Sequence, residues 1–198
     1  GVMIFEGDAF PKELQGNAFV CEGAGNLVHR MQLKPDGVAM AAHRTETKRE
    51  FLTSDEIWFR PVQLHNGPDG ALYVVDMYRE VFEHPDAVPP SVRKYIDLNT
   101  GNDRGRIYRV VPTDFQRPAR RRLSDLTSRQ LVDVLDEPNK WARNTAARLL
   151  YERQDSTAIA PLEQMATKSP SPISRMRAMY ALAGLGALAE GIVVQRLK

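Results

Sequence analysis

The sequence predicts a β plus α protein, in which a strand-rich region is followed by a helix-rich one. Between about residues 17 and 111, short runs of β-branched and aromatic residues alternate with turns that contain Gly and Pro. After Pro118 the apolar residues recur at helical spacing instead. We therefore expect two domains, residues 1–118 and residues 119–198.

The strand-rich region reads as a series of hairpins. The predicted strands are 17–22, 27–33, 59–65, 71–78 and 105–111. A glycine-rich connection at 23–26 joins the first two, and Lys34-Pro35-Asp36-Gly37 has the composition of a turn. Gly67-Pro68-Asp69-Gly70 is the turn of a third hairpin, in which Asn66 is expected to shape the turn and Asp69 to be a turn residue rather than a calcium ligand.

The predicted strand 71–78 is apolar on both faces. Leu72 and Val74 share one face, whereas Tyr73, Val75 and Met77 share the other. A strand with one solvated face would alternate apolar and polar residues. The pattern therefore predicts burial on both sides, as in stacked sheets of a sandwich or between the blades of a propeller.

The helix-rich region predicts two helical hairpins. A first helix covers 123–135, with Thr127 or Ser128 as its cap and Pro138 after its end. A third covers about 160–167, where Pro161 is tolerated because it lies in the first turn. The second and fourth are marked by apolar residues at helical spacing, and we interpret Trp141, Met176 and Met179 as core residues of these hairpins.

The second and fourth helices look like copies of one unit. The segments NKWARNTAARLL and SRMRAMYALAGL recur about 34 residues apart, a spacing typical of helical-hairpin repeats. Two such repeats cannot bury their own faces, because an array normally needs at least three. We therefore expect the chain to come from the middle of a longer protein.

Composition excludes several classes of function. The net charge of +2 divides into −3 over residues 1–118 and +5 over residues 119–198, too mild an asymmetry to predict a nucleic-acid partner. The Arg120-Arg121-Arg122 cluster is interpreted as a solvated linker. Cys21 is the only cysteine, which excludes an internal disulfide, a multi-cysteine zinc site and a haem-attachment motif, and we expect it to be a buried small apolar residue. No apolar run is long enough to span a membrane, and no histidine spacing predicts a metal site.

Three β motifs and the helical segments together resemble a known family. The motifs are QGNAFVCEGAGNLVHRMQL (15–33), FRPVQLHNGPDGALYVVDMYR (59–79) and GRIYRVVP (105–112). In this order they resemble the closing blades of a six-bladed propeller in the bacterial membrane-bound dehydrogenases, whose propeller is similar to that of the soluble quinoprotein glucose and sorbosone dehydrogenases. The segments WARNTAARLL and RMRAMYALAGLG match the HEAT-like repeats that follow the propeller in that family, so the resemblance covers about residues 12–190.

The resemblance implies a periplasmic or secreted dehydrogenase that oxidises a sugar or alcohol and passes electrons to a c-type cytochrome domain outside this chain. Its soluble relatives bind pyrroloquinoline quinone with an Arg-x-Arg pair and a hairpin Lys, because guanidinium forks suit the carboxylates of the cofactor. Trp58 and Ala24 stand in this sequence where the first Arg and the Lys would be, so Arg60 alone remains. The family's histidine base lies in earlier blades, so no catalytic residue is assigned and the isolated chain is expected to be inactive.

Six residues are candidates for a site. For cofactor binding we name Arg60, Asp76 and Arg79, with the alternative that Arg60 pairs with an acid and that Asp76 pairs with Arg79 or Arg60 for structural reasons. For substrate binding we name Trp58, which would stack on a sugar, and two histidines, His65 beside the turn and His84 in a long loop. A second hypothesis for the whole chain is a non-catalytic propeller–HEAT module that binds polysaccharide or protein.

Overall fold

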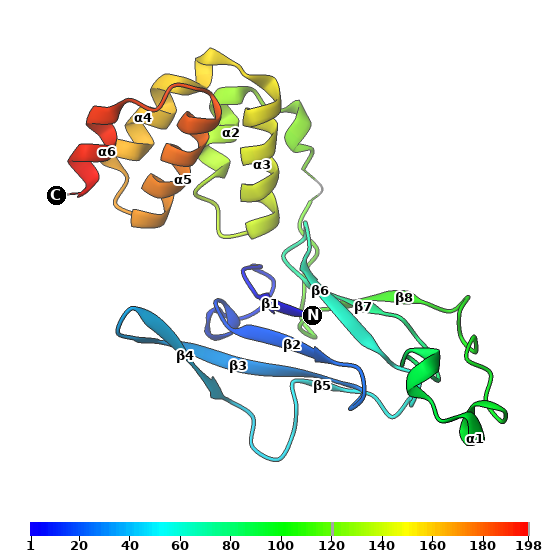
Figure 1. Ribbon diagram of the computed structural model, residues 1–198. Coiled ribbons are helices and arrows are strands. Elements are labelled where there is room, and N and C mark those ends of the chain that lie inside the picture. The colour runs from blue at the N-terminus through cyan, green and yellow to red at the C-terminus, as the bar shows by residue number, and fades with distance from the viewer. Residues whose placement is uncertain (120, 198) are drawn as a thin grey trace. The chain divides into compact units, whose positions relative to one another are not determined.

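The computed structural model describes residues 1–119 and 121–197, and Figure 1 shows its strands and helices. The chain divides into two compact units, Gly1–Gln116 and Arg117–Lys198, whereas the sequence predicts the change after residue 118. The first unit holds two antiparallel sheets, neither of which closes on itself within the described residues, and the second holds helices. The chain is therefore of the β plus α class, while the propeller and HEAT assignments remain predictions.

The first sheet is larger than the sequence predicts. Its strands are β1 (Val2–Ile4), β2 (Ala18–Glu22), β3 (Leu27–Asp36) and β4 (Ala39–Arg44), in that order, and β5 (Leu52–Thr53) pairs with β3. The turn predicted at 34–37 lies at residues 37 and 38 instead, because β3 continues to Asp36, which pairs with Ala39. Pro35 is tolerated there because β3 has passed the end of β2 and has a partner on one side only. Gly37 makes the turn instead, with a φ of 60° that a two-residue hairpin turn of this kind requires.

The second sheet contains the predicted hairpin and one further strand. Its order is β6 (Pro61–Asn66), β7 (Leu72–Asp76) and β8 (Arg106–Val110), all antiparallel. Along β7, Leu72, Val74 and Asp76 are buried, whereas Tyr73 and Val75 are half-buried. The prediction of burial on both faces is therefore only half met within this chain, because one face of the sheet is covered and the other is partly open.

A single apolar core lies between the two sheets of the first unit. Phe19 contacts both Phe5 and Phe51 in edge-to-face geometry, with ring centroids 5.9 Å and 4.8 Å away. The fully or nearly buried members of this core come from both sheets and their connections: Phe5, Phe19, Val28, Phe59, Leu64, Leu72 and Val74. Cys21 packs against the edge of this core, and it is half-buried rather than buried.

The connection from β7 to β8 is long and contains two short helical segments, η2 (Pro85–Ala87) and α1 (Pro90–Arg93).

The second unit then begins with η3 (Leu123–Asp125) and α2 (Ser128–Val134), so the predicted helix 123–135 is split in two. The split occurs because Thr127 caps α2 in a capping box with Gln130, which starts the helix there. Arg120 of the predicted basic linker lies outside the described residues, and Arg121 pairs with Glu137 at 2.5 Å.

The remaining helices are α3 (Lys140–Arg153), η4 (Ser156–Ala158), α4 (Ile159–Lys168) and α5 (Pro172–Gly184), followed by α6 (Glu190–Leu197). α2 packs against α3, and α4 packs against α5, so these four helices form two hairpins. Corresponding features of α3 and α5 are 32 residues apart rather than the predicted 34. They are the N-caps Asn139 and Ser171, the buried pairs Ala146/Ala178 and Leu150/Leu182, and the left-handed residues Gln154 and Gly186.

The core of the helical unit is built mainly from Leu and Ala. Trp141 and Met176, which the sequence places in this core, are instead 37% and 45% exposed, and Met179 alone packs against it. The reason is that other stripes of α3 and α5 face the core, Ala146 with Leu150 and Ala178 with Leu182, which leaves Trp141 and Met176 on the outer side. The prediction for Trp141 and Met176 is therefore wrong.

Candidate functional site

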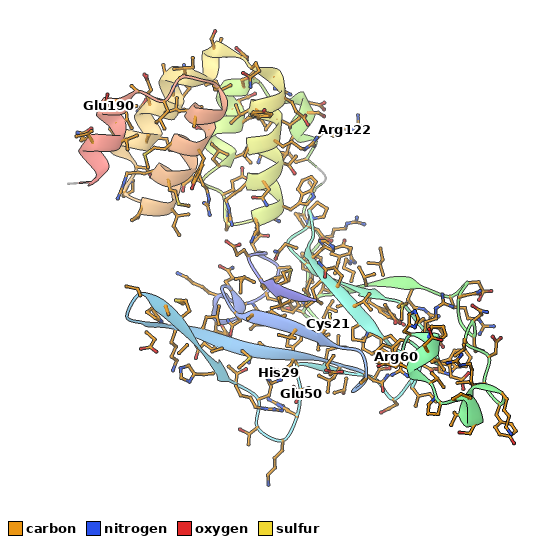
Figure 2. All side chains as sticks on the ribbon, in the orientation of Figure 1. Cys21, His29, Glu50, Arg60, Arg122 and Glu190 are labelled. Carbon is orange, nitrogen blue, oxygen red and sulfur yellow. The ribbon has the colours of Figure 1, made fainter. Side chains whose placement is uncertain are left out.

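Four of the six predicted site residues meet at one end of the β6–β7 hairpin. Trp58 and Arg60 precede β6, and Asp76 and Arg79 end or follow β7, so the pairing of Pro61 with Asp76 brings the two pairs together. Figure 2 labels Arg60 in this region, at the end of the hairpin opposite the Gly67–Gly70 turn. The convergence follows from the hairpin register, which the sequence predicts.

The guanidinium of Arg60 is bound by three backbone carbonyls from two parts of the chain. Its Nε donates to the Arg79 carbonyl at 3.0 Å, its Nη1 to Gly23 at 2.8 Å, and its Nη2 to Glu80 at 3.0 Å. Its flat side also lies over the ring of Phe82, with the guanidinium carbon 5.0 Å from the ring centroid. We call this set the Arg60 clamp, because it joins the β2–β3 turn to the segment that follows β7.

Asp76 also binds backbone rather than a side chain. Asp76 is 1% exposed, and its Oδ1 accepts hydrogen bonds from the backbone N–H groups of Arg60 and Tyr78, both at 2.8 Å. Its Oδ2 is buried and has no hydrogen-bond partner among the described residues. The expected pairing with the guanidinium of Arg60 or Arg79 is therefore not formed. Arg106 lies directly opposite Asp76 on β8. Burial lowers the pKa of the Arg106 guanidinium, but Tyr108, Tyr78 and Asp76 together outweigh this effect and raise the pKa.

Trp58 and Arg79 hold the backbone of the same region. The ring of Trp58 meets Tyr78 edge-to-face at 5.6 Å, and the other neighbour of Tyr78 is the Arg106 guanidinium, 3.7 Å from the ring centroid. Tyr78 has a left-handed backbone with a φ of 51°, which its bond to Asp76 and this stack stabilise. Arg79 donates from Nη1 to the Asn99 carbonyl at 3.0 Å, so it fastens the long connection between β7 and β8.

The two predicted histidines lie elsewhere. His65 is exposed on β6, opposite Tyr73 of β7. His84 caps η2, since its Nδ1 accepts the backbone N–H of Asp86 at 3.3 Å. Asn66 does not shape the neighbouring turn: its Oδ1 accepts the backbone N–H of Glu6 at 2.9 Å, which ties β6 to the segment after β1.

The residues of this region do not fit a bound quinone in the arrangement described. Each nitrogen of the Arg60 guanidinium already donates to a carbonyl, and Asp76 adds an acidic group beside it, which would repel the carboxylates of the cofactor. The role of Arg60, Asp76 and Arg79 in cofactor binding therefore stays a prediction from the resemblance. What the geometry supports is that Arg60 joins the β2–β3 turn to the segment after β7.

A second polar cluster, which the sequence does not predict, lies beside β3. His29 Nδ1 lies 2.5 Å from Glu50 Oε2, Arg44 also pairs with Glu50, and Arg30 pairs with Glu46 at 2.7 Å. The bond from His29 and the charge of Arg44 lower the pKa of the Glu50 carboxyl. Figure 2 shows His29 and Glu50 next to each other.

The Glu50 carboxylate orients the imidazole of His29, an arrangement that also occurs in catalytic sites. However, the pairs join β3 and β4 to the segment 45–51, and no group of three or more metal-binding side chains occurs in the part of the chain that is described. We therefore interpret the cluster as a tie between the sheet and this loop. The only signal for it in the sequence is the run of alternating charges in HRTETKRE (43–50).

Burial and charge around the remaining ionisable groups give no further site in this unit. For Glu46, burial is opposed by hydrogen bonds from Thr45 and Arg30, which lower the pKa of its carboxyl. Burial raises the pKa of the Cys21 thiol, against the opposing charge of the N-terminal amine. A thiol with a raised pKa is a poor nucleophile, so Cys21 is a packing residue.

Comparison with known proteins places the chain in one family. Among the helices described, none has the length and apolar character needed to cross a membrane. No curated protein and no solved structure matches the sequence. Residues 1–114, more than half of the 198 residues, match the family described as a domain of unknown function, DUF7133. The chain belongs to the DUF7133 family.

Proposed function

We propose that these residues are a non-catalytic part of a larger periplasmic or secreted dehydrogenase that is similar to the quinoproteins. In this proposal residues 1–118 are the last blades of a propeller and the helical hairpins are the first HEAT-like repeats. The whole protein would oxidise a sugar or alcohol and pass the electrons to a c-type cytochrome domain. The ordered series of three β motifs and two helical repeats supports this proposal.

One observation supports a structural rather than a catalytic role for this part, namely the engagement of Arg60. Its three guanidinium nitrogens donate to the carbonyls of Gly23, Arg79 and Glu80, so the residue that the resemblance assigns to the cofactor holds two segments of the chain together. The half-open second face of the β6–β7–β8 sheet, where Ile107 is 66% exposed, is compatible with a neighbouring blade.

A titration of the 198-residue chain with pyrroloquinoline quinone and calcium ions tests the proposal. We expect no binding in the micromolar range by calorimetry, and no reduction of a redox dye when glucose is added with the quinone. The matched measurement on the longer protein is expected to show quinone binding that survives in Arg60→Ala. Dehydrogenase activity of the isolated chain, or loss of quinone binding in Arg60→Ala with unchanged stability, would refute the assignment.

The second candidate function, a module that binds a protein, is favoured by a different observation. Large apolar side chains are exposed on α3 and α5, among them Trp141, Met176 and Tyr180. An exposed apolar surface of this kind is a common site of protein binding.

A further inference from the structure

The outer edge of β4 is a free strand edge. β4 is the last strand of the first sheet and pairs with β3 alone. Within the described part of the chain, no hydrogen bond joins the backbone of residues 39–43 to any element except β3. Figure 1 shows β4 at the border of its sheet. The N–H and C=O groups along such an edge are able to pair with a further strand.

The hairpin turn determines which backbone groups of β4 point outward. Residues 37 and 38 form a two-residue turn, so Asp36 and Ala39 beside it exchange both of their backbone hydrogen bonds. Such pairs alternate along an antiparallel ladder, so Ala41 also bonds to β3. The backbone groups of Met40 and Ala42 therefore point away from β3, along the free edge.

β4 lacks the features that normally keep an edge strand from pairing, which are shortness, proline, bulges and charged side chains. It has six residues in unbroken register with β3, and residues 39–43 contain no proline and no side chain that is charged at pH 7. By contrast, β1 has three residues, and β8 carries Arg106 and Arg109. β6 begins with Pro61 and has a register shift beside it. Among these strands, β4 is the one whose edge is unprotected.

The β3–β4 hairpin also leaves apolar side chains uncovered. β3 extends past the end of β2, so the hairpin leaves the sheet as a two-stranded ribbon. Directly paired residues share a face, and one face of this ribbon carries Leu33, Pro35, Met40 and Ala42. Met40 is 56% exposed, and Val38 in the turn is fully exposed. A two-stranded hairpin is marginally stable by itself, so a further strand would stabilise the ribbon.

We propose that β4 pairs with β4 of a second copy of this chain, antiparallel about a two-fold axis at Ala41. In this register the uncharged residues 39–43 of the two copies lie opposite each other, so no charges of like sign meet. Met40 lies opposite Ala42 of the second copy, so the outward backbone groups of these residues bond to each other and the Met40 side chain covers Ala42. The pairing is isologous, so it closes at a dimer.

Two other occupants of the edge fit less well. Pairing of β4 with β8 of a second copy would be heterologous and would leave a free edge on each copy, so assembly would continue beyond a dimer. A strand of an unrelated protein would bond to the same backbone groups, but residues 39–43 offer it only Ala, Met and a neutral His, with no charge to select it. The segment is complementary to itself, which favours the second copy.

Sedimentation velocity of the whole 198-residue chain tests for the dimer. The mean mass is expected to rise with concentration towards twice that of one chain, with a dissociation constant on the order of 10–100 μM, as for a small transient interface. Ala42→Pro removes an outward N–H and is expected to abolish the dimer, while an edge position of this kind tolerates proline. Ala42→Thr keeps the N–H and favours a strand, so this matched control should still form the dimer.

Cross-linking locates the two-fold axis. Opposite residues that are not hydrogen-bonded to each other have Cα atoms about 4.5 Å apart, which is within the range of a disulfide. Ala41→Cys is therefore expected to give a covalent dimer when oxidised glutathione is added. Ala39→Cys, which would face His43 of the second copy, should not, and the parent chain controls for Cys21. Circular dichroism checks that each variant folds, and if Ala42→Pro does not fold, the cross-linking pair decides.

Each outcome decides the proposal. A dimer that is lost in Ala42→Pro but kept in Ala42→Thr, with cross-linking of Ala41→Cys alone, supports it. A chain that stays monomeric at about 200 μM overturns it; if that monomer binds a labelled peptide of alternating Thr and Val, the edge takes a foreign strand instead. A dimer that folded Ala42→Pro leaves intact, equal cross-linking of Ala41→Cys and Ala39→Cys, or a mass that rises beyond the dimer also overturns it, because other surfaces then join the copies.

Discussion

Replacing Arg60 by Ala should destabilise the β unit, because the side chain joins the β2–β3 turn to the segment after β7. Two of its hydrogen bonds, to the Gly23 and Arg79 carbonyls, are partly buried, and the third, to Glu80, is exposed. Hydrogen bonds to charged groups contribute about 1.5–3 kcal/mol each, and we take the lower value for the two partly buried bonds and little for the exposed one. The free energy of unfolding should therefore fall by about 3 kcal/mol.

The assay follows the β unit alone. The chain has two tryptophans, Trp58 and Trp141, of which Trp58 belongs to the β unit and Trp141 to the helical unit. In a Trp141→Phe background, urea unfolding followed by tryptophan fluorescence reports on the β unit. With a denaturant slope of about 1.5 kcal/mol per molar urea, the midpoint should fall by about 2 M.

Arg79→Ala is the matched control, because Arg79 is a nearby cation with a single described bond to a backbone carbonyl. Its midpoint should fall by less than about 0.7 M, which corresponds to about 1 kcal/mol at the same slope. Arg60→Lys keeps the charge but not the fork, and should lie between Arg60→Ala and the parent. If Arg60→Ala costs no more than Arg79→Ala, the Arg60 clamp does not stabilise the unit and the guanidinium is available for a ligand.

Three further predictions use the same fluorescence assay or a simple chemical one. Asp69→Asn should lower the free energy of unfolding by about 1–2 kcal/mol, because the nearly buried Asp69 carboxylate accepts from Arg109 at 3.1 Å and locks the hairpin turn; an unchanged urea midpoint contradicts this. The pKa of the Glu50 carboxyl is lower in the folded than in the unfolded state, so as pH falls the unfolded state is protonated first. The contribution of ionised Glu50 to the free energy of unfolding is therefore complete above about pH 4.3 and is lost as pH falls through the folded-state pKa. Glu50→Gln should therefore flatten the acid side of the stability profile, and parallel profiles would show that the His29–Glu50 pair does not contribute. Because burial raises the pKa of Cys21, its thiol should react with Ellman's reagent at pH 8 far more slowly in the folded chain than in urea, and equal rates would contradict the assignment.

A hairpin could be predicted where the residues of its own turn determine it, but not where a strand forms only because a neighbouring strand pairs with it. The Gly67–Gly70 turn fixes β6 and β7 through its own residues. In contrast, β4 has the sequence AMAAHR, whose Ala and Met residues favour a helix. It is a strand because the long β3 offers it a partner and Gly37 sets the register between them. No window of the sequence contains that information.

The hydrogen-bond partners of the site residues are even harder to predict from the sequence. The sequence predicts that Arg60 and Asp76 meet, since both positions follow from the hairpin register. It cannot predict their partners, because the Arg60 clamp uses carbonyl groups, which every residue supplies. The bond from Asn66 to the backbone of Glu6 is invisible for a related reason, since it joins positions 60 residues apart.

In the helical unit, periodicity identifies the faces of a helix but not which face is buried. Trp141 and Met176 recur at the spacing of a helix stripe, and their size suggests a core position. The core instead takes the stripes that contain Ala146 and Leu150 on α3 and Ala178 and Leu182 on α5. Trp141 and Met176 therefore lie on the exposed side of these helices.

The arginines of the two units have one structural task in common, which is to bind backbone carbonyls. Arg175 Nη1 donates to the carbonyls of Ser169 and Pro170 in the turn before α5, as the guanidinium of Arg60 does to its three carbonyls. Arg175→Ala removes both bonds, so the thermal midpoint of the helical unit by circular dichroism should fall. Arg148→Ala is the control, because this exposed side chain pairs with Glu152 of its own helix, and such surface pairs contribute little to stability. Equal midpoints for the two variants would show that the Arg175 bonds do not stabilise the turn, and that carbonyl binding by arginine is not a shared device of the two units.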